Sequence, residues 1–240
     1  MVQSAKSLVH RHPVPRWSEE WLIPEETVPE SQPHDIVLDL LKALLLAFVA
    51  RTKMNAQVAR NLAVRFTADN PRVGVDPDLC LITPRTPEGD DLESLRLWEP
   101  GHSPPALAIE VVSASNAEKD YVRSPEKYAS CGSKELWIFD PKLAGRATYG
   151  GPQRLQVWQL KDETFELTYA GEGPAFSAVL GAWLHVVDEG RKLRVADDRE
   201  GTTFWPTAEE SERAAKEAER AAKEAALARV AELEAELRRR

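Results

Sequence analysis

The feature that most constrains this chain is an apolar run that carries a single carboxylate. "PPALAIEVVSAS", residues 104–115, places Glu110 between Ile109 and Val111, with further aliphatic residues on either side. Such runs are typical of strands buried on both faces of a sheet, where an ionised carboxylate is costly without a partner. The sequence therefore predicts a buried strand whose glutamate faces either a metal ion or a structural Arg or Lys.

Around this run, segments with helix and strand patterns alternate. Apolar residues at helical spacing predict a helix over 33–50, and Gly132 is suited to end a second helix over 115–132. The predicted strands are 56–69, 73–84, 134–141 and a hairpin over 154–171 that turns at "KDET". Helices before and between strands are typical of an α/β or α+β sheet with helices on its faces.

Three regions of the 240 residues differ in composition. Residues 1–33 are rich in Pro and Trp without a period, and we expect an irregular arm that packs on the core through Trp17 and Trp21. Residues 34–206 have the patterns and length of one main domain. Residues 207–240 contain strong helix formers and no Gly or Pro, which predicts a long charged helix.

This predicted tail helix begins with a capping-box signature, Thr207 followed by Glu210. Alanines from Ala214 to Ala228 form a narrow seam at coiled-coil spacing, while Val230, Leu233 and Leu237 continue in a shifted phase. A coiled coil and a solvated single helix both remain open.

Composition excludes several classes of protein. The longest apolar run is interrupted by Asp39 and Lys42, so we expect no membrane span, and no signal-peptide core precedes it. Cys80 and Cys131 form no CxxC pair, and the histidines lack zinc spacing, so we expect a cytoplasmic protein with two apolar filler cysteines. The net charge of −8 argues against a broadly basic DNA-binding surface, so any nucleic-acid contact must be local or assisted by a metal.

A second carboxylate stands at the start of another apolar strand. In "VDPDLCLI", Asp78 follows Pro77 and precedes the run Leu79–Ile82. If this strand neighbours the one carrying Glu110, both carboxylates converge, and a divalent cation would offset their repulsion and desolvation. Alone, Asp78 could simply start a strand after a turn. Hard carboxylate ligands without His or Cys nearby favour magnesium or manganese, which would polarise a phosphodiester and activate a bound water.

Three segments together resemble a known family. "PDLCLI", "PPALAIEVVSASN" and "DYVRSPEKYASCGSKELWIFDP" look like the Uma-type restriction endonuclease family of the PD-(D/E)XK nuclease superfamily. The resemblance covers roughly residues 30–190. It implies a restriction-endonuclease-like mixed β-sheet core flanked by helices, DNA as the substrate, and magnesium, with manganese as a substitute. The ligands it implies are Asp78, Glu110 and the main-chain carbonyl of Val111.

The chain departs from this family's pattern at one position. The superfamily's usual lysine, two residues after the glutamate, is Val112 here. In the Uma-type pattern a lysine instead comes from the following helix, four residues before the tyrosine of "YA", and that place is Ser124. Lys127 lies three residues beyond Ser124 on the same helix face, so its long stem could deliver an ammonium to a similar point. Lys127 is therefore the candidate catalytic lysine, and Lys119 is a nearby alternative.

Three more residues are candidates for auxiliary roles, each with a structural alternative. His34 matches a histidine near the start of the family's first helix, but it could equally cap or pack that helix. Ser113 and Asp120 suit hydrogen bonds to the metal ligands, or merely the end of a strand and the cap of a helix. Asp140, before Pro141, has the pattern of a turn residue.

We therefore expect a metal-dependent endonuclease that cleaves DNA phosphodiester bonds with an activated water. Because cutting both strands needs two active sites, and because the tail carries an apolar stripe, we also expect a homodimer. The alternative is a catalytically inactive nuclease-fold protein that acts as an interaction or oligomerisation module through its C-terminal helix.

Overall fold

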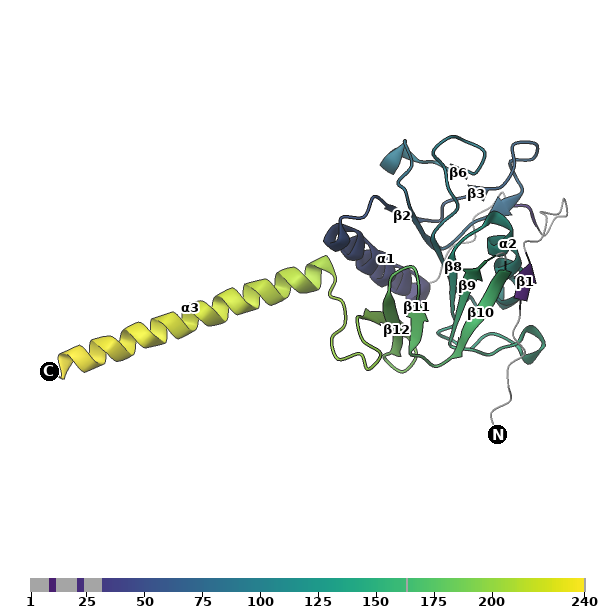
Figure 1. Cartoon of the computed structure of the whole chain (residues 1–240). Coiled ribbons are helices and arrows are strands. Elements are labelled where there is room, and N and C mark those ends of the chain that lie inside the picture. The colour runs from purple at the N-terminus through teal and green to yellow at the C-terminus, as the bar shows by residue number, and fades with distance from the viewer. Residues whose placement is uncertain (1–8, 12–20, 24–31, 163, 240) are drawn as a thin grey trace. The chain divides into compact units, whose positions relative to one another are not determined.

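The structure is a computed structural model that describes residues 9–11, 21–23, 32–162 and 164–239. The chain divides into two compact units, Met1–Trp205 and Pro206–Arg240 (Figure 1). Of the predicted arm contacts, Trp17 lies outside the described residues. Trp21 is buried and packs edge-to-face on Phe66, with ring centroids 6.3 Å apart.

The first unit is built on a seven-stranded mixed sheet in the order β1-β10-β9-β8-β7-β5-β2. These strands are, in chain order, β1 Val9–Arg11, β2 Gln57–Arg60, β5 Leu79–Ile82, β7 Leu107–Val111, β8 Glu135–Phe139, β9 Leu155–Lys161 and β10 Thr164–Gly171. Neighbours are antiparallel except β7 and β8, which are parallel and joined by a helical crossover. All five residues of β7 are buried, which confirms the central strand that the apolar run predicts.

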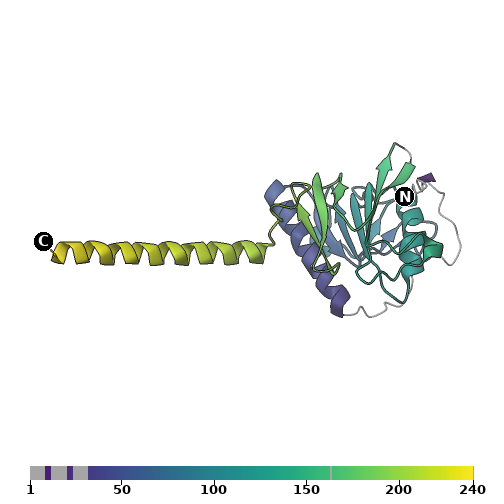
Figure 2. The same cartoon turned by 90° about the horizontal axis from the view of Figure 1, so that it is seen from below.

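Helices and a second sheet cover the two faces of the main sheet (Figure 2). The helix α1 (Gln32–Thr52) and a three-stranded sheet pack on the face formed by Leu107, Ile109 and Val111. The strands of this smaller sheet are β11 Ala175–Ser177, β12 Ala182–Val187 and β13 Lys192–Ala196. The helix α2 (Ser124–Cys131) packs on the other face, against Ala108. The alternation of side chains along β7 thus divides the core into two layers, and the predicted α/β (α+β) class is confirmed.

The predicted strand boundaries need correction next to β5. The segment 56–69 is not one strand but β2 and β3 (Val64–Arg65), separated by Asn61, whose φ of 51° is left-handed. The segment 73–84 is likewise divided into β4 (Gly74–Val75) and β5, and the break contains Asp78. The pieces β4 and β3 join β6 (Leu95–Arg96) in a small separate sheet.

Other elements are short. Two 3₁₀ turns, η2 (Gly89–Asp91) and η4 (Ala147–Tyr149), lie in loops. A π-helical turn, η3 (Lys119–Arg123), runs directly into α2, and Gly132 ends that helix in the left-handed conformation as predicted. Within the described part of the chain, no helix combines the length and apolar character needed to cross a membrane.

The second unit is one helix, α3 (Ala208–Arg238). Thr207 and Glu210 form the predicted capping box, with the Glu210 N–H donating to Thr207 Oγ1 and the Thr207 N–H donating to Glu210 Oε2. Among the described residues of α3, none is buried.

Glu135 on β8 is a buried carboxylate that joins the main sheet to β11. It is fully buried and accepts hydrogen bonds from three side chains and two main-chain N–H groups. These donors are Trp137 Nε1, Gln159 Nε2, Ser177 Oγ, and the N–H groups of Ala178 and Val179. Burial raises the pKa of Glu135, while the hydrogen bonds from Ser177 and Trp137 act in the opposite direction.

Glu135→Ala is expected to lower the free energy of unfolding by about 3 kcal/mol, because several buried donors lose their acceptor at once. Urea denaturation measures the change. Glu166→Ala, which removes a partner of the partly exposed Lys161 ion pair, is the control and is expected to change stability by less than about 1 kcal/mol. Equal losses in the two variants would contradict this role of Glu135.

Candidate functional site

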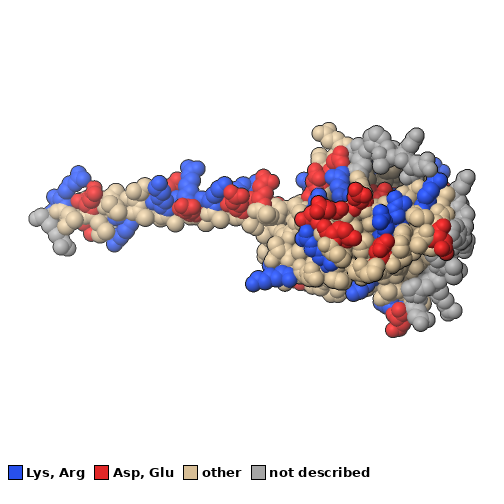
Figure 3. All heavy atoms as spheres, turned by 90° about the horizontal axis from the view of Figure 1, so that it is seen from above, with Lys and Arg blue, Asp and Glu red and all other residues tan. Residues whose placement is uncertain are grey.

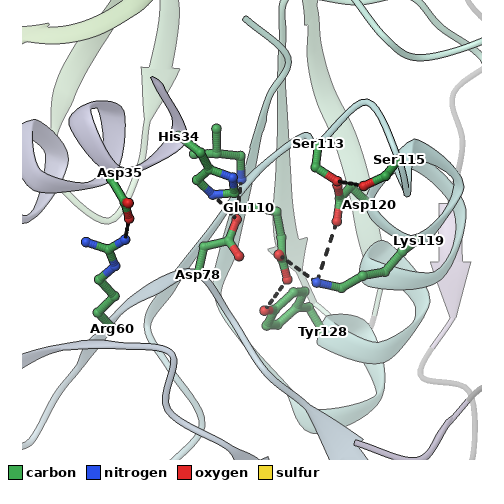
Figure 4. Close-up of polar contacts among 11 residues, drawn as sticks. His34, Asp35, Arg60, Asp78, Glu110, Ser113, Ser115, Lys119, Asp120 and Tyr128 are labelled. Carbon is green, nitrogen blue, oxygen red and sulfur yellow. Dashed lines mark hydrogen bonds and ion pairs between the residues drawn. The ribbon is translucent and has the colours of Figure 1, made fainter. Parts of the chain in front are cut away.

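Asp78 and Glu110 face each other on neighbouring strands. Leu79 of β5 pairs with Ile109 of β7 in antiparallel register, so the residue before Leu79 lies opposite the residue after Ile109. The Val111 N–H donates to Asp78 Oδ2 at 2.7 Å, which holds the Asp78 carboxylate against the end of β7. The structure thus brings together the two carboxylates that the sequence analysis singled out (Figure 4).

The Glu110 side chain is fully buried and has two polar partners. Tyr128 Oη, on α2, donates to Oε1 at 2.7 Å, and Lys119 Nζ, on the π-helical turn, lies 3.3 Å from Oε2. Burial raises the pKa of Glu110 to about 7; the Lys119 charge lowers it and the Asp78 charge raises it further. Two partners therefore do not fully compensate the desolvation of this carboxylate.

Asp78 is held from its other side by the start of α1. His34 Nε2 lies 3.3 Å from Asp78 Oδ2. One residue further on, Asp35 contacts the Arg60 guanidinium of β2, and Asp39 Oδ1 lies 3.0 Å from Arg60 Nη1. Arg60 thus ties the first two turns of α1 to the sheet edge and places His34 beside the carboxylate.

Lys119 is shared between two acidic groups. Its Nζ lies 3.7 Å from Asp120 Oδ1 as well as 3.3 Å from Glu110, and 37% of its side chain is exposed. The charge of Glu110 raises the pKa of Lys119, so the ammonium stays protonated. Asp120 is only 4% exposed, and burial raises its pKa well above the ordinary value. The Lys119 ammonium is therefore surrounded by three carboxyl groups, those of Glu110, Asp120 and Asp78. A single positive charge does not balance these three acidic groups.

The two lysine candidates have different surroundings. Lys119, expected as the alternative, contacts Glu110, whereas Lys127 directly precedes Tyr128 on α2 and is half-buried. Because successive helical residues project about 100° apart, and Tyr128 points at Glu110, the side chain of Lys127 leaves the helix in another direction. Ser124, one turn before Tyr128, is buried, and its hydroxyl has no hydrogen-bond partner among the described residues.

The remaining predicted residues lie around this cluster. Ser113 Oγ lies 3.2 Å from Ser115 Oγ in the loop after β7. Asp140 is not merely a turn residue: it is fully buried and accepts hydrogen bonds from Tyr121 Oη and from the N–H groups of Ala144 and Gly145. Tyr128 and Arg60 are parts of the site that were not predicted from the sequence. Tyr128 could have been found, because it lies on the apolar face of the predicted second helix. No pattern in the sequence marks Arg60.

The oxygen donors at this point suit a hard divalent cation. Asp78 and Glu110 supply carboxylate oxygens here, and Mg²⁺ commonly keeps several water ligands, so a few protein oxygens suffice. Within the described ranges, no three His, Cys, Asp or Glu side chains are grouped closely enough to be a preformed metal cage. Lys119 is also the partner that a purely structural Glu110 would need. The surplus of negative charge beside a fully buried carboxylate is what favours a cation.

The family to which the motifs point also matches the chain as a whole-family model. The model of a family described as Uma2, putative restriction endonuclease, matches residues 17–172. Among solved structures, the chain is similar to one described as a putative nuclease of DUF820 from Anabaena variabilis ATCC 29413, with 15% sequence identity, a TM-score of 0.45, and coverage of 64% of this chain and 76% of that one. No curated protein matches the chain.

Glu110→Gln is expected to stabilise the protein at pH 8 more than at pH 5. Since burial raises the Glu110 pKa to about 7, the stability that its protonated form contributes is complete below about pH 4.5 and is lost as pH rises through about 7. Glutamine carries no charge at either pH. Calorimetry should give an increase in Tm of about 2–4 °C at pH 8 and a smaller one at pH 5. A difference from wild type that does not change with pH would contradict the raised pKa.

Proposed function

The chain belongs to the Uma2 family of putative restriction endonucleases, and on that premise we propose that it is a metal-dependent endonuclease that hydrolyses DNA phosphodiester bonds. The observation that carries the proposal is the register of β5 and β7, which sets Asp78 opposite Glu110 at the edge of a buried, negatively charged cluster. A nuclease-like function follows from the family, while the metal, the substrate and the residue roles are parts of the proposal.

Asp78, Glu110 and the main-chain carbonyl of Val111 would hold Mg²⁺, or Mn²⁺ in its place. When bound, such an ion polarises a phosphodiester and lowers the pKa of a bound water. The contacts of Asp78 with the Val111 N–H and His34 orient one ligand, and the Tyr128 hydroxyl orients the other. The protein thereby fixes both carboxylates before any substrate arrives.

Lys119, in place of Lys127, is the residue we propose to act on the phosphate. Its ammonium lies at the Glu110 carboxylate and is partly exposed to solvent, so it can orient the attacking water or stabilise charge that develops on the phosphate oxygens. The raised pKa keeps this group charged at neutral pH. The neighbouring Asp120 limits how far Nζ can move.

The face seen in Figure 3 favours a local DNA contact over a broad one. Acidic and basic side chains alternate on the face seen in Figure 3, with no continuous basic area among the described residues in that view. The net charge of −8 also disfavours a broad DNA-binding surface. A divalent cation at the carboxylates would therefore supply much of the attraction for phosphate.

Purified protein is expected to nick supercoiled plasmid DNA with Mg²⁺ or Mn²⁺ and not with EDTA. Asp78→Asn and Glu110→Gln should each lower the cleavage rate by about 10²-fold or more, because each removes a charged ligand, and Lys119→Ala by about 10- to 100-fold. Gel analysis of nicked and linear DNA over time measures these rates.

Lys134→Ala, which alters an exposed lysine near α2, is the matched control and should cleave like wild type. Lys127→Ala decides between the two lysines, since a loss there with no loss in Lys119→Ala would restore Lys127 as the candidate. Nicking that survives both carboxylate substitutions would identify a contaminating nuclease, and no nicking with either metal would refute the enzymatic proposal.

An interaction role for α3 is the second candidate function, and a specific observation favours it. Four apolar side chains of this helix, Leu227, Val230, Leu233 and Leu237, are between 43% and 71% exposed. Helices in proteins gain most of their stability by packing an apolar face against a partner. A second copy of the chain, joined through α3 as a coiled coil, would cover these side chains and give the homodimer that double-strand cutting requires.

The double variant Leu233→Glu/Leu237→Glu is expected to sediment as a monomer at concentrations where wild type is a dimer, because like charges would meet across the seam. Ala235→Glu adds a charge on the side of α3 away from Leu233 and Leu237 and is expected to leave the dimer intact. Sedimentation equilibrium of the full chain measures both. A monomeric wild type would exclude this role for α3.

A further inference from the structure

We propose that the π-helical turn Lys119–Arg123 is a positioning device that aims Lys119 at Glu110, and that Tyr121 is the residue that holds this turn. The inference rests on the proposed function of Lys119. It adds Tyr121, with its partners Asp140 and Gln153, as positioning residues that touch neither substrate nor metal.

The geometry of the helix requires such a device. Nine residues separate Lys119 from Tyr128, which in a regular α-helix is about two and a half turns, so the two side chains would point to opposite faces. A π turn absorbs one extra residue, and the Ser124 N–H closes it by donating to the Lys119 carbonyl. Lys119 and Tyr128 are then related like residues eight positions apart in a regular α-helix, which is about 2.2 turns. Both side chains therefore reach Glu110 (Figure 4).

The π turn is held in place by Tyr121 at its centre. The Tyr121 hydroxyl lies 2.8 Å from Asp140 Oδ2 and 2.9 Å from the Gln153 carbonyl, and it accepts a hydrogen bond from the Gln153 N–H at 3.0 Å. Asp140 is itself fixed by the N–H groups of Ala144 and Gly145. The hydroxyl is thus surrounded by three polar partners that belong to the loop after β8.

The ring of Tyr121 is enclosed as tightly as its hydroxyl. A Cβ atom added to Gly145 would lie 2.4 Å from the ring, and one added to Gly151 would lie 2.9 Å from it. Only residues without a side chain leave this space for the tyrosine. The loop around Tyr121 therefore fixes the residue two positions after Lys119, and with it the direction in which the lysine leaves the helix.

The helix after the turn offers an independent position for a lysine. Ser124 begins α2 and lies one α-helical turn before Tyr128. Its buried hydroxyl has no hydrogen-bond partner within the described part of the chain. A lysine at this position would share the face of Tyr128 whether or not the π turn forms. Position 124 can therefore test whether Tyr121 acts through the direction of Lys119 or through stability alone.

The test begins with Tyr121→Phe in the full chain, which keeps the ring and removes the hydroxyl. The first measurement is the acylation rate of Lys119 by an amine reagent, mapped by mass spectrometry with exposed Lys134 as the internal reference. We expect the Lys119 rate to rise about three- to tenfold, because the amine leaves its ion pair with Glu110 and becomes more accessible to the reagent. This measurement needs neither metal nor DNA.

The second measurement is cleavage of supercoiled DNA. Tyr121→Phe should lower kcat toward the value of Lys119→Ala with little change in KM, and it should have no further effect in the Lys119→Ala background. Tyr169→Phe is the matched control, because the Tyr169 hydroxyl also holds a loop, by accepting the Gly173 N–H, and lies on β10. Ser124→Lys should restore cleavage to Lys119→Ala and make it insensitive to Tyr121→Phe.

The outcomes separate the inference from the proposed function. An unchanged Lys119 acylation rate in Tyr121→Phe overturns the inference, whatever the DNA assay shows. A raised rate in a protein that does not cleave DNA supports the positioning role and refutes the endonuclease. If Tyr121→Phe does not fold, Asp140→Asn, which weakens the acceptor of the same hydroxyl, is measured in its place with the same expected rise, and no rise overturns the inference.

Discussion

The burial of the Glu110 carboxylate is the constraint on which this site depends. A fully buried acid in the central strand needs partners from several elements at once. It finds a hydroxyl from α2 and an ammonium from the π-helical turn, and it faces Asp78 from β5. Strands and helix are therefore fixed relative to one another by one polar group, and the crossover between β7 and β8 carries two of its partners.

Much of the fold could be predicted from the sequence, because its elements carry strong patterns. The buried strand around Glu110, the helix ended by Gly132 and the hairpin after Arg154 all follow from apolar spacing and turn residues. The sheet β11–β13 was not predicted, since its strands are only three to six residues long. The break between β4 and β5 was also missed, although it is this break that leaves Asp78 at the start of a strand.

The pairing of Asp78 with Glu110 was accessible from the sequence, because Asp78 starts one apolar strand and Glu110 lies within another. The identity of the lysine was not. Counting along a regular helix favours Lys127 and places Lys119 opposite Tyr128, and only the π turn reverses that conclusion. The turn is held by a loop that lies more than fifteen residues further along the chain, so no local pattern could indicate it.

Three fully buried carboxylates of this chain differ in the partners that surround them. Glu135 and Asp140 are fully buried, and the hydrogen-bond donors around them are neutral: main-chain N–H groups and the side chains of Trp, Gln, Ser and Tyr. Such groups satisfy a carboxylate permanently and leave nothing to exchange. Glu110 has one neutral donor, a lysine shared with Asp120, and a second carboxylate opposite. A purely structural ion pair does not need that second carboxylate, whereas the proposed metal site uses both.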